Sequence, residues 1–150
     1  MSASVSTERD PEPQDGRWHW TMPVRVRWTD LDALGHVHHL VYLRWCEDAR
    51  NEHAEAIGLP LPGTGARSQV VVAMACDFRQ PVGRGAEPSV CLRVTRVGRT
   101  SLEARFGIQV DGVAHFAARV TTVMCEDRTG QASPWTPAER ERLLAGPVPA

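Results

Sequence analysis

Acid–base groups are concentrated in one short stretch of this chain, residues 30–39, whose sequence is DLDALGHVHH. The stretch holds two carboxylates, a glycine and three imidazoles: Asp30, Asp32, Gly35, His36, His38 and His39. Carboxylates and imidazoles are the groups that move protons near neutral pH, and the N-terminus of a helix stabilises developing negative charge. Because a strongly patterned helical segment follows directly, our first hypothesis is that this loop carries catalysis.

The element that must position this loop is a helix predicted over residues 40–57. Apolar and small side chains recur there at three- and four-residue spacing and give the helix one buried face: Tyr42, Trp45, Cys46, Ala49, His53 and Ala56. Charged and amide side chains fill the opposite face. Gly58 and Pro60 end the helix, and a proline- and glycine-rich loop, LPLPGTGAR, follows.

Apolar patterning predicts several strands around this helix. Residues 24–28, VRVRW, alternate with the period of a half-buried strand. Residues 69–78, QVVVAMACDF, are nearly all apolar, which favours a central strand covered on both faces. Further strands are predicted over residues 89–97, 101–110 and 113–125, joined by turns at residues 98–100 and at Asp111-Gly112.

One long helix among these strands is too few for a doubly wound parallel sheet. The order of a strand, a helix and then a strand meander implies the α+β class, with the helix on one face of a mostly antiparallel sheet. Exposed edge strands in such a sheet commonly pair with a second copy, so we expect a dimer.

Composition and charge exclude several classes of function. A net charge of −1 gives no electrostatic reason to expect a nucleic acid or an anionic membrane as partner. No apolar run is long enough to span a bilayer. The four cysteines are far apart and lack histidines at ligand spacing, so neither a zinc site nor a disulfide framework is indicated. We therefore expect no metal, and a reduced, cytoplasmic protein.

The chain divides into three parts by composition. Residues 1–17 are polar, acidic and proline-bearing, which predicts a disordered leader. Residues 18–135 have the length and apolar content of a single domain. Residues 136–150 form a C-terminal tail with a candidate short helix, which begins at Thr136-Pro137 and has Glu139 in its first turn.

The loop and helix start, TDLDALGHVHHLVYL followed by EDAR, resemble the signature of the hotdog-fold acyl thioesterases. The most similar group is the 4-hydroxybenzoyl-CoA thioesterase-like family. Weaker landmarks follow in the family's order at DFRQPV, VGRTS and residues 127–134, so the resemblance runs over residues 23–134. Many members carry Asn-Asn where this chain has His38-His39, which leaves the branch, and with it the acyl class, open.

The resemblance implies a hotdog fold, a sheet wrapped around one long central helix. It implies homodimers, often assembled into homotetramers, with active sites at the dimer interface. The implied reaction is hydrolysis of an acyl thioester, carried either by coenzyme A or by the phosphopantetheine arm of an acyl carrier protein, without a bound cofactor. The catalytic carboxylate corresponds to Asp32, acting as nucleophile or as general base.

The oxyanion would be held by main-chain N–H groups near His39 and Leu40, as the resemblance implies, on a turn that Gly35 permits. His36 and His39 are candidates to orient the substrate or the catalytic carboxylate. His38 has the least support as a site residue.

Two substrate-binding candidates lie outside the loop. Tyr42 is a core position that also borders the expected acyl pocket. Arg79 could contact the phosphates of coenzyme A. The alternative interpretation is that Arg79 is an ordinary surface arginine without a role in binding. Asp30 is interpreted as structural rather than catalytic.

Two other functions compete with thioester hydrolysis. A hotdog dehydratase or hydratase typically pairs an aspartate with a histidine five residues later, and the gap from Asp32 to His36 is shorter. A non-catalytic module that binds acyl-CoA would not need the intact Asp32 and Gly35.

Overall fold

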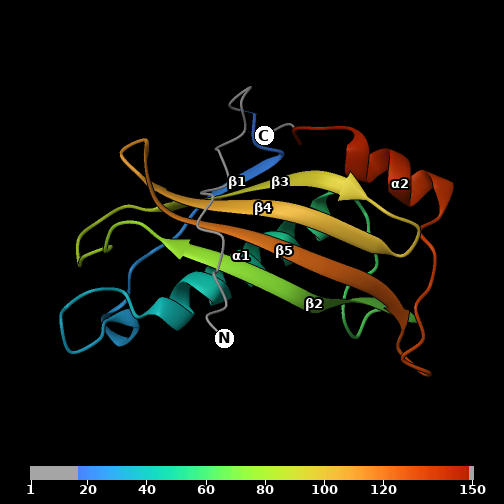
Figure 1. Cartoon of the computed structure of the whole chain (residues 1–150), viewed down its shortest axis with the longest axis horizontal. Coiled ribbons are helices and arrows are strands. Elements are labelled where there is room, and N and C mark those ends of the chain that lie inside the picture. The colour runs from blue at the N-terminus through green and yellow to red at the C-terminus, as the bar shows by residue number, and fades with distance from the viewer. Residues whose placement is uncertain (1–16, 149–150) are drawn as a thin grey trace, which may run out of the picture.

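An antiparallel sheet packs along one long helix in this protein, which confirms the α+β prediction (Figure 1). The computed structural model describes residues 17–148. The five strands are β1 (Trp20–Pro23), β2 (Arg67–Phe78), β3 (Ser89–Val97), β4 (Ser101–Val110) and β5 (Val113–Glu126), and their order in the sheet is β1-β3-β4-β5-β2. A short 3-10 helix, η1 (Trp28–Asp30), precedes helix α1 (His39–Ala56), and helix α2 (Pro137–Leu144) follows the sheet.

Helix α1 begins and ends within one residue of the predicted bounds. Its first turn is capped by His38, whose side chain accepts a hydrogen bond from the N–H of Leu40. At the other end Gly58 has a φ of 70°, and the N–H of Leu59 bonds to the carbonyl of Ala54 at 2.8 Å. A left-handed residue after the last turn is the conformation for which glycine is favoured.

The central strands match the sequence prediction closely. Strands β3 and β4 have the predicted bounds, and β5 extends one residue beyond its prediction. Asp111 and Gly112 have φ values of 51° and 75°, so the hairpin between β4 and β5 has the two positive φ angles that this dipeptide favours. Alternating buried positions on these strands form one apolar face that packs on helix α1.

The strand predicted over residues 24–28 is wrong. Strand β1 ends at Pro23, which pairs with Ser89, the first residue of β3. Beyond that point there is no strand left to pair with, and Val24 donates only to the carbonyl of Pro88 at 2.9 Å. Residues 24–27 still alternate between half-buried valines and exposed arginines, so the period of burial is present without a sheet ladder.

The central position predicted for residues 69–78 is also wrong. Strand β2 is the edge of the sheet and pairs only with β5. Its residues 70–76 are all exposed in the single chain, with Val72 at 57%. The continuous apolar run correctly predicts a strand, but no other part of the described chain covers both faces of that strand.

The tail after residue 135 contains helix α2 and packs against the domain. Thr136 caps the helix, with reciprocal hydrogen bonds between Thr136 and Glu139. Glu139 also accepts from Arg67 at 2.7 Å, and Leu143 is 1% exposed. The expected leader lies outside the described residues except for Arg17.

A buried imidazole in this core makes stability depend on pH. His53 on α1 is 4% exposed, and burial, aided by the nearby charge of His19, lowers its pKa from 6.5 to about 4. The folded state therefore binds a proton less readily than the unfolded chain does. Stability is fully present above pH 6.5 and is lost as the pH falls towards 4.

We predict that protonation of His53 in the unfolded chain lowers the free energy of unfolding by about 2 kcal/mol between pH 7 and pH 5. Urea unfolding at the two pH values measures this change. The variant His53→Gln cannot gain this proton, so its stability should change much less over the same interval. Equal pH dependence in the two proteins would contradict the prediction.

Candidate active site

The loop before α1 is closed by its own backbone. Leu31 and Val37 form an isolated antiparallel bridge, and the N–H of Asp32 donates to the carbonyl of His36 at 2.8 Å. The N–H of Gly35 donates to the carbonyl of Asp32 at 3.0 Å, and Gly35 has a φ of 75°. The chain therefore reverses direction between Asp32 and His36, at a glycine whose conformation other residues rarely adopt.

A second loop, residues 79–88, supports the first from outside. The N–H of Val37 donates to the carbonyl of Val82 at 2.8 Å, and His36 bridges to Gly83. The N–H of Val82 in turn donates to the hydroxyl of Tyr42 at 3.1 Å. Val82 is the last residue of the landmark DFRQPV, but a valine in a loop carries no chemical signal of this backbone role.

The Asp32 carboxylate is half-buried and only partly satisfied. Its Oδ1 accepts hydrogen bonds from the N–H groups of Leu34 at 2.9 Å and His36 at 3.2 Å. Within residues 17–148 its Oδ2 has no hydrogen-bond partner. One oxygen is thus fixed by the turn while the other is available to a ligand.

Tyr42 lies beside this carboxylate. Burial is the main cause that raises the pKa of its hydroxyl; the hydrogen bond from Val82 opposes this, and the charge of Asp32 adds to it. The Tyr42 ring stacks on Phe116, with centroids 5.3 Å apart. The structure thus brings Tyr42 close to Asp32, although its hydroxyl is already engaged by the second loop.

Asp30, two residues before Asp32, has the opposite environment. It is 1% exposed, and its two oxygens accept from the N–H of Arg27 and from Nη2 of Arg44, each at 2.8 Å. Burial works to raise the pKa of this carboxyl, but the hydrogen bonds and charges of Arg44 and Arg27 outweigh it and hold the pKa below its usual value. This geometry is that of a structural aspartate.

The first turn of α1 presents one unpaired main-chain donor. The Leu40 N–H donates to Nδ1 of His38 at 3.2 Å, and the Gly35 N–H is used within its turn. The N–H of His39 has no hydrogen-bond partner in the described part of the chain. Of the three backbone positions expected near an oxyanion, only that of His39 is free.

The imidazoles of the loop are arranged differently from one another. His38 is the helix cap, and its ring stacks on that of His39, with centroids 4.3 Å apart. His39 is exposed and meets the edge of Phe78 at 6.3 Å between centroids. His36 is half-buried and takes part in the loop through its backbone.

Arg79 lies just beyond the end of β2. Its Nε donates to the carboxylate of Asp77 at 3.1 Å, and its backbone N–H donates to the carbonyl of His115 at 2.9 Å. The side chain is half-buried and already engaged with an acidic neighbour, so a contact with coenzyme A would have to compete with Asp77.

A groove of about 400 Å³ lies between α1 and the sheet, and at Leu40 it reaches the start of the helix, next to the loop at residues 30–39. Its apolar lining comes from both layers and includes Leu40, Leu43, Val71, Met74, Phe106 and Val120. Arg44, Glu47 and Arg50 add charge along the helix.

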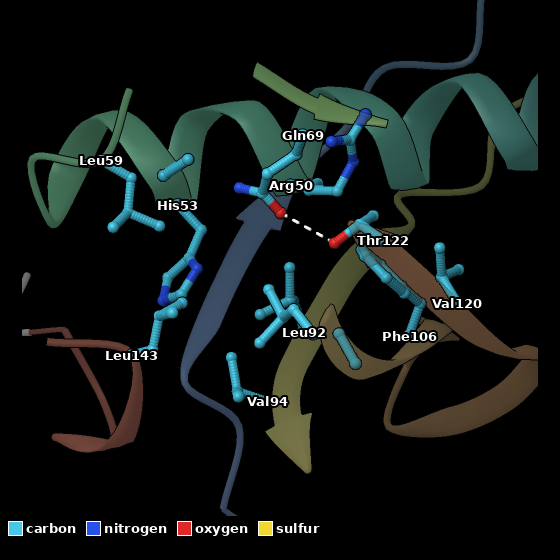
Figure 2. A pocket seen from close by; sticks show the side chains of 13 residues that line it. Arg50, His53, Leu59, Gln69, Leu92, Val94, Phe106, Val120, Thr122 and Leu143 are labelled. Atoms are coloured by element: carbon cyan, nitrogen blue, oxygen red, sulfur yellow. Dashed lines mark hydrogen bonds between the residues drawn. The ribbon is translucent and has the colours of Figure 1, made fainter. Parts of the chain in front are cut away.

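Figure 2 shows a small cavity that shares Arg50, Phe106 and Val120 with this groove, and in it the ring of His53 lies beside Leu143. Gln69 and Thr122 also line this cavity. Arg50 is the last residue of EDAR, which the sequence shares with the family signature, but no separate role was predicted for it. Its place one turn after Cys46 puts it on the apolar side of the helix.

Residues 17–148 lack two kinds of feature. They contain no group of three or more His, Cys, Asp or Glu side chains that could hold a metal ion. No helix among them is long and apolar enough to cross a membrane.

Comparison with known proteins gives the family. The model of the thioesterase-like superfamily matches residues 26–143. A 1,4-dihydroxy-2-naphthoyl-CoA hydrolase of Synechococcus sp. (strain WH7803) is 34% identical over 122 residues, which are 73% of this chain and 80% of that protein.

Solved structures agree with this match. A thioesterase of Thermus thermophilus, in complex with coenzyme A and zinc, has a TM-score of 0.75 at 31% identity and covers 85% of this chain and 93% of its own. The PA5185 protein of Pseudomonas aeruginosa PAO1 has a TM-score of 0.79 at 28% identity, over 89% of this chain and 95% of its own. With the family model covering the loop, the helix and the sheet, this chain belongs to the thioesterase-like superfamily and has its hotdog fold.

Proposed function

We propose that this protein hydrolyses acyl-CoA thioesters with Asp32 as the catalytic carboxylate. The observation that carries the proposal is the asymmetry of that carboxylate: Oδ1 is held by two backbone N–H groups while Oδ2 has no partner in the described part of the chain. A nucleophile or general base needs one oxygen aimed by the protein and another free to react.

The reaction divides between the carboxylate and the helix start. Asp32 either attacks the thioester carbon, giving an anhydride that water opens, or removes a proton from water as the water attacks. In both cases one water is consumed, the C–S bond breaks, the acyl group leaves as a carboxylic acid, and the sulfur leaves as the thiolate of coenzyme A. The unpaired N–H of His39 is suited to stabilise the oxyanion, a contribution worth about a hundredfold in rate.

Support for coenzyme A as the carrier comes from relatives. The similar Synechococcus protein is named as the hydrolase of a naphthoyl-CoA ester, and the Thermus thioesterase binds coenzyme A. An acyl carrier protein would present the same phosphopantetheine thioester and is the alternative carrier. Neither carrier requires a resident cofactor for the chemistry proposed here.

The mechanism predicts that Asp32→Asn lowers kcat/KM for acyl-CoA by at least about a hundredfold, equal to about 2.7 kcal/mol of barrier. The asparagine Oδ1 can still accept from Leu34 and His36, so the loop is kept and only the charge is lost. Thiol release from short, long and aromatic acyl-CoAs measures the effect.

Asp48→Asn is the matched control, because it makes the same chemical change at an exposed position of α1 and should leave kcat/KM unchanged. Asp30→Asn is a second comparison, because the carboxylate of Asp30 holds the loop in place. This second substitution weakens a buried charge-assisted contact to Arg44, so we expect a loss of about 2 kcal/mol in stability. If Asp32→Asn hydrolysed acyl-CoA at the wild-type rate, Asp32 would not be the catalytic group. If wild type released no thiol from any ester, an acyl-carrier-protein assay and direct binding of acyl-CoA would separate the other carrier from a non-catalytic module.

We further propose that two copies of the chain pair along strand β2. This strand is an unpaired edge, and its apolar residues are exposed in the single chain: Val70, Val71, Val72 and Met74. An edge of this kind is a template for another strand, and a two-fold axis would join it to the same strand of a second copy. The second copy would also close the open side of the groove beside α1.

Pairing through β2 predicts that Val72→Lys dissociates the dimer, because charge on an edge strand opposes strand addition. Sedimentation velocity measures the change in mass. Val113→Lys is the matched control, since Val113 is also an exposed valine, at 49% against 57%, but lies at the β4–β5 turn. A Val72→Lys protein that sediments like wild type would exclude this interface.

A further inference from the structure

Arg50 is a buried cation with too few partners for its donors. It lies on the inner side of α1 and is 8% exposed. A guanidinium carries five N–H donors, yet among the described residues its hydrogen-bond partner is Glu47 alone, at 3.4 Å. That distance is long for a charge-assisted contact, which is normally about 2.7–2.9 Å, and the Glu47 side chain is 64% exposed.

The neighbours of Arg50 do not use its remaining donors. Thr122 donates to the side-chain oxygen of Gln69 at 2.9 Å, and these two polar groups satisfy each other across the small cavity (Figure 2). Among residues 17–148, the buried side-chain donor without a partner is Nε1 of Trp20, so the remaining donors of Arg50 face the open groove rather than closed protein. A guanidinium of such low exposure gains more from an acceptor that another molecule supplies than a surface arginine does.

The groove connects Arg50 to the catalytic loop. Its helical wall starts at Leu40, next to the free N–H of His39, and ends at Arg50. Ten residues of helix span about 15 Å, and helical side chains lean towards the N-terminus by roughly a turn, about 5 Å. The guanidinium is therefore about 10 Å along the groove from the helix start, a distance that an extended chain covers in about eight bonds at about 1.2 Å per bond.

We infer that Arg50 binds an oxygen acceptor at the far end of the acyl group, so that this enzyme selects acyl groups that end in a carboxylate or hydroxyl. The inference rests on the proposed function and names its substrate class. The apolar walls, Leu43, Met74 and Val120, suit the body of such a chain. Arg44, the other cation in the groove, is already bound to Asp30, whereas Arg50 has donors to spare.

The matched substrates are suberyl-CoA and octanoyl-CoA, which have the same chain length and differ in the terminal carboxylate. The measured quantity is the ratio of their kcat/KM values. Arg50→Met keeps the apolar stem and removes the donors, and it should lower the suberyl/octanoyl ratio by about tenfold or more, the usual worth of a charge-assisted hydrogen bond. Arg50→Lys should restore part of the ratio.

Glu47→Gln provides a test in the opposite direction. The Glu47 carboxylate competes for the same guanidinium, so its neutralisation should raise the suberyl/octanoyl ratio. Thermal unfolding and sedimentation of each variant show whether fold and assembly are intact.

Binding to Asp32→Asn protein, measured by calorimetry, gives a second readout that needs no turnover. A binding preference for suberyl-CoA that disappears in the Asp32→Asn/Arg50→Met double variant supports the inference, whether or not the wild-type protein hydrolyses either ester. Absence of hydrolysis by the wild-type protein would overturn the proposed function instead. An unchanged ratio and unchanged binding preference in Arg50→Met would overturn the inference while leaving hydrolysis intact. Dissociation of Arg50→Met into monomers without a change in the ratio would assign Arg50 to the subunit interface instead.

Discussion

The loop before α1 depends on one ion pair, between the buried carboxylate of Asp30 and the partly exposed guanidinium of Arg44. Asp30 joins three parts of the chain: its carboxylate accepts from the backbone of Arg27 and from the side chain of Arg44 on α1, and its carbonyl accepts from the N–H of His38. A carboxylate that is 1% exposed gains more from charge-assisted hydrogen bonds than a surface carboxylate does. Because the pair joins the loop to the second turn of the helix, it fixes how the turn at Asp32 faces the helix start.

Asp30 and Asp32, which lie in one tripeptide, thus differ in their hydrogen-bond partners and in their exposure. Asp30 has both oxygens bonded and a cation beside it, so its charge is fully used within the protein. Asp32 has one oxygen bonded to backbone and one free, so its charge remains available. The difference lies in which backbone N–H groups each carboxylate meets, and that follows from the turn centred on Gly35 and from the 3-10 turn before Asp30.

The sequence predicted those parts of the fold that local patterns determine. Helix α1, strands β3 and β4 and the Asp111-Gly112 hairpin depend on periodicity and turn chemistry within about 20 residues. The two errors, residues 24–28 and the position of β2, concern which segments pair across the sheet. The alternation in VRVRW reflects which side chains are buried, and it does not show that the segment pairs with another strand. The apolar run of β2 does not show whether the residues that cover its side chains belong to the same chain or to a second copy. Within the site, side-chain type identifies the loop residues, whereas the contacts of Val82 and the burial of Arg50 depend on their positions in the fold.

His38 illustrates how a substitution within the motif can keep geometry. Asparagine is a favoured helix cap because its side-chain oxygen accepts from the first turn, and His38 does the same through Nδ1. An imidazole accepts only through a nitrogen without a proton, so this cap places the ring proton on Nε2. The larger ring also stacks on His39, which an asparagine could not do. The histidine pair therefore keeps the cap that leaves the His39 N–H unpaired and adds a stacked aromatic surface at the start of α1.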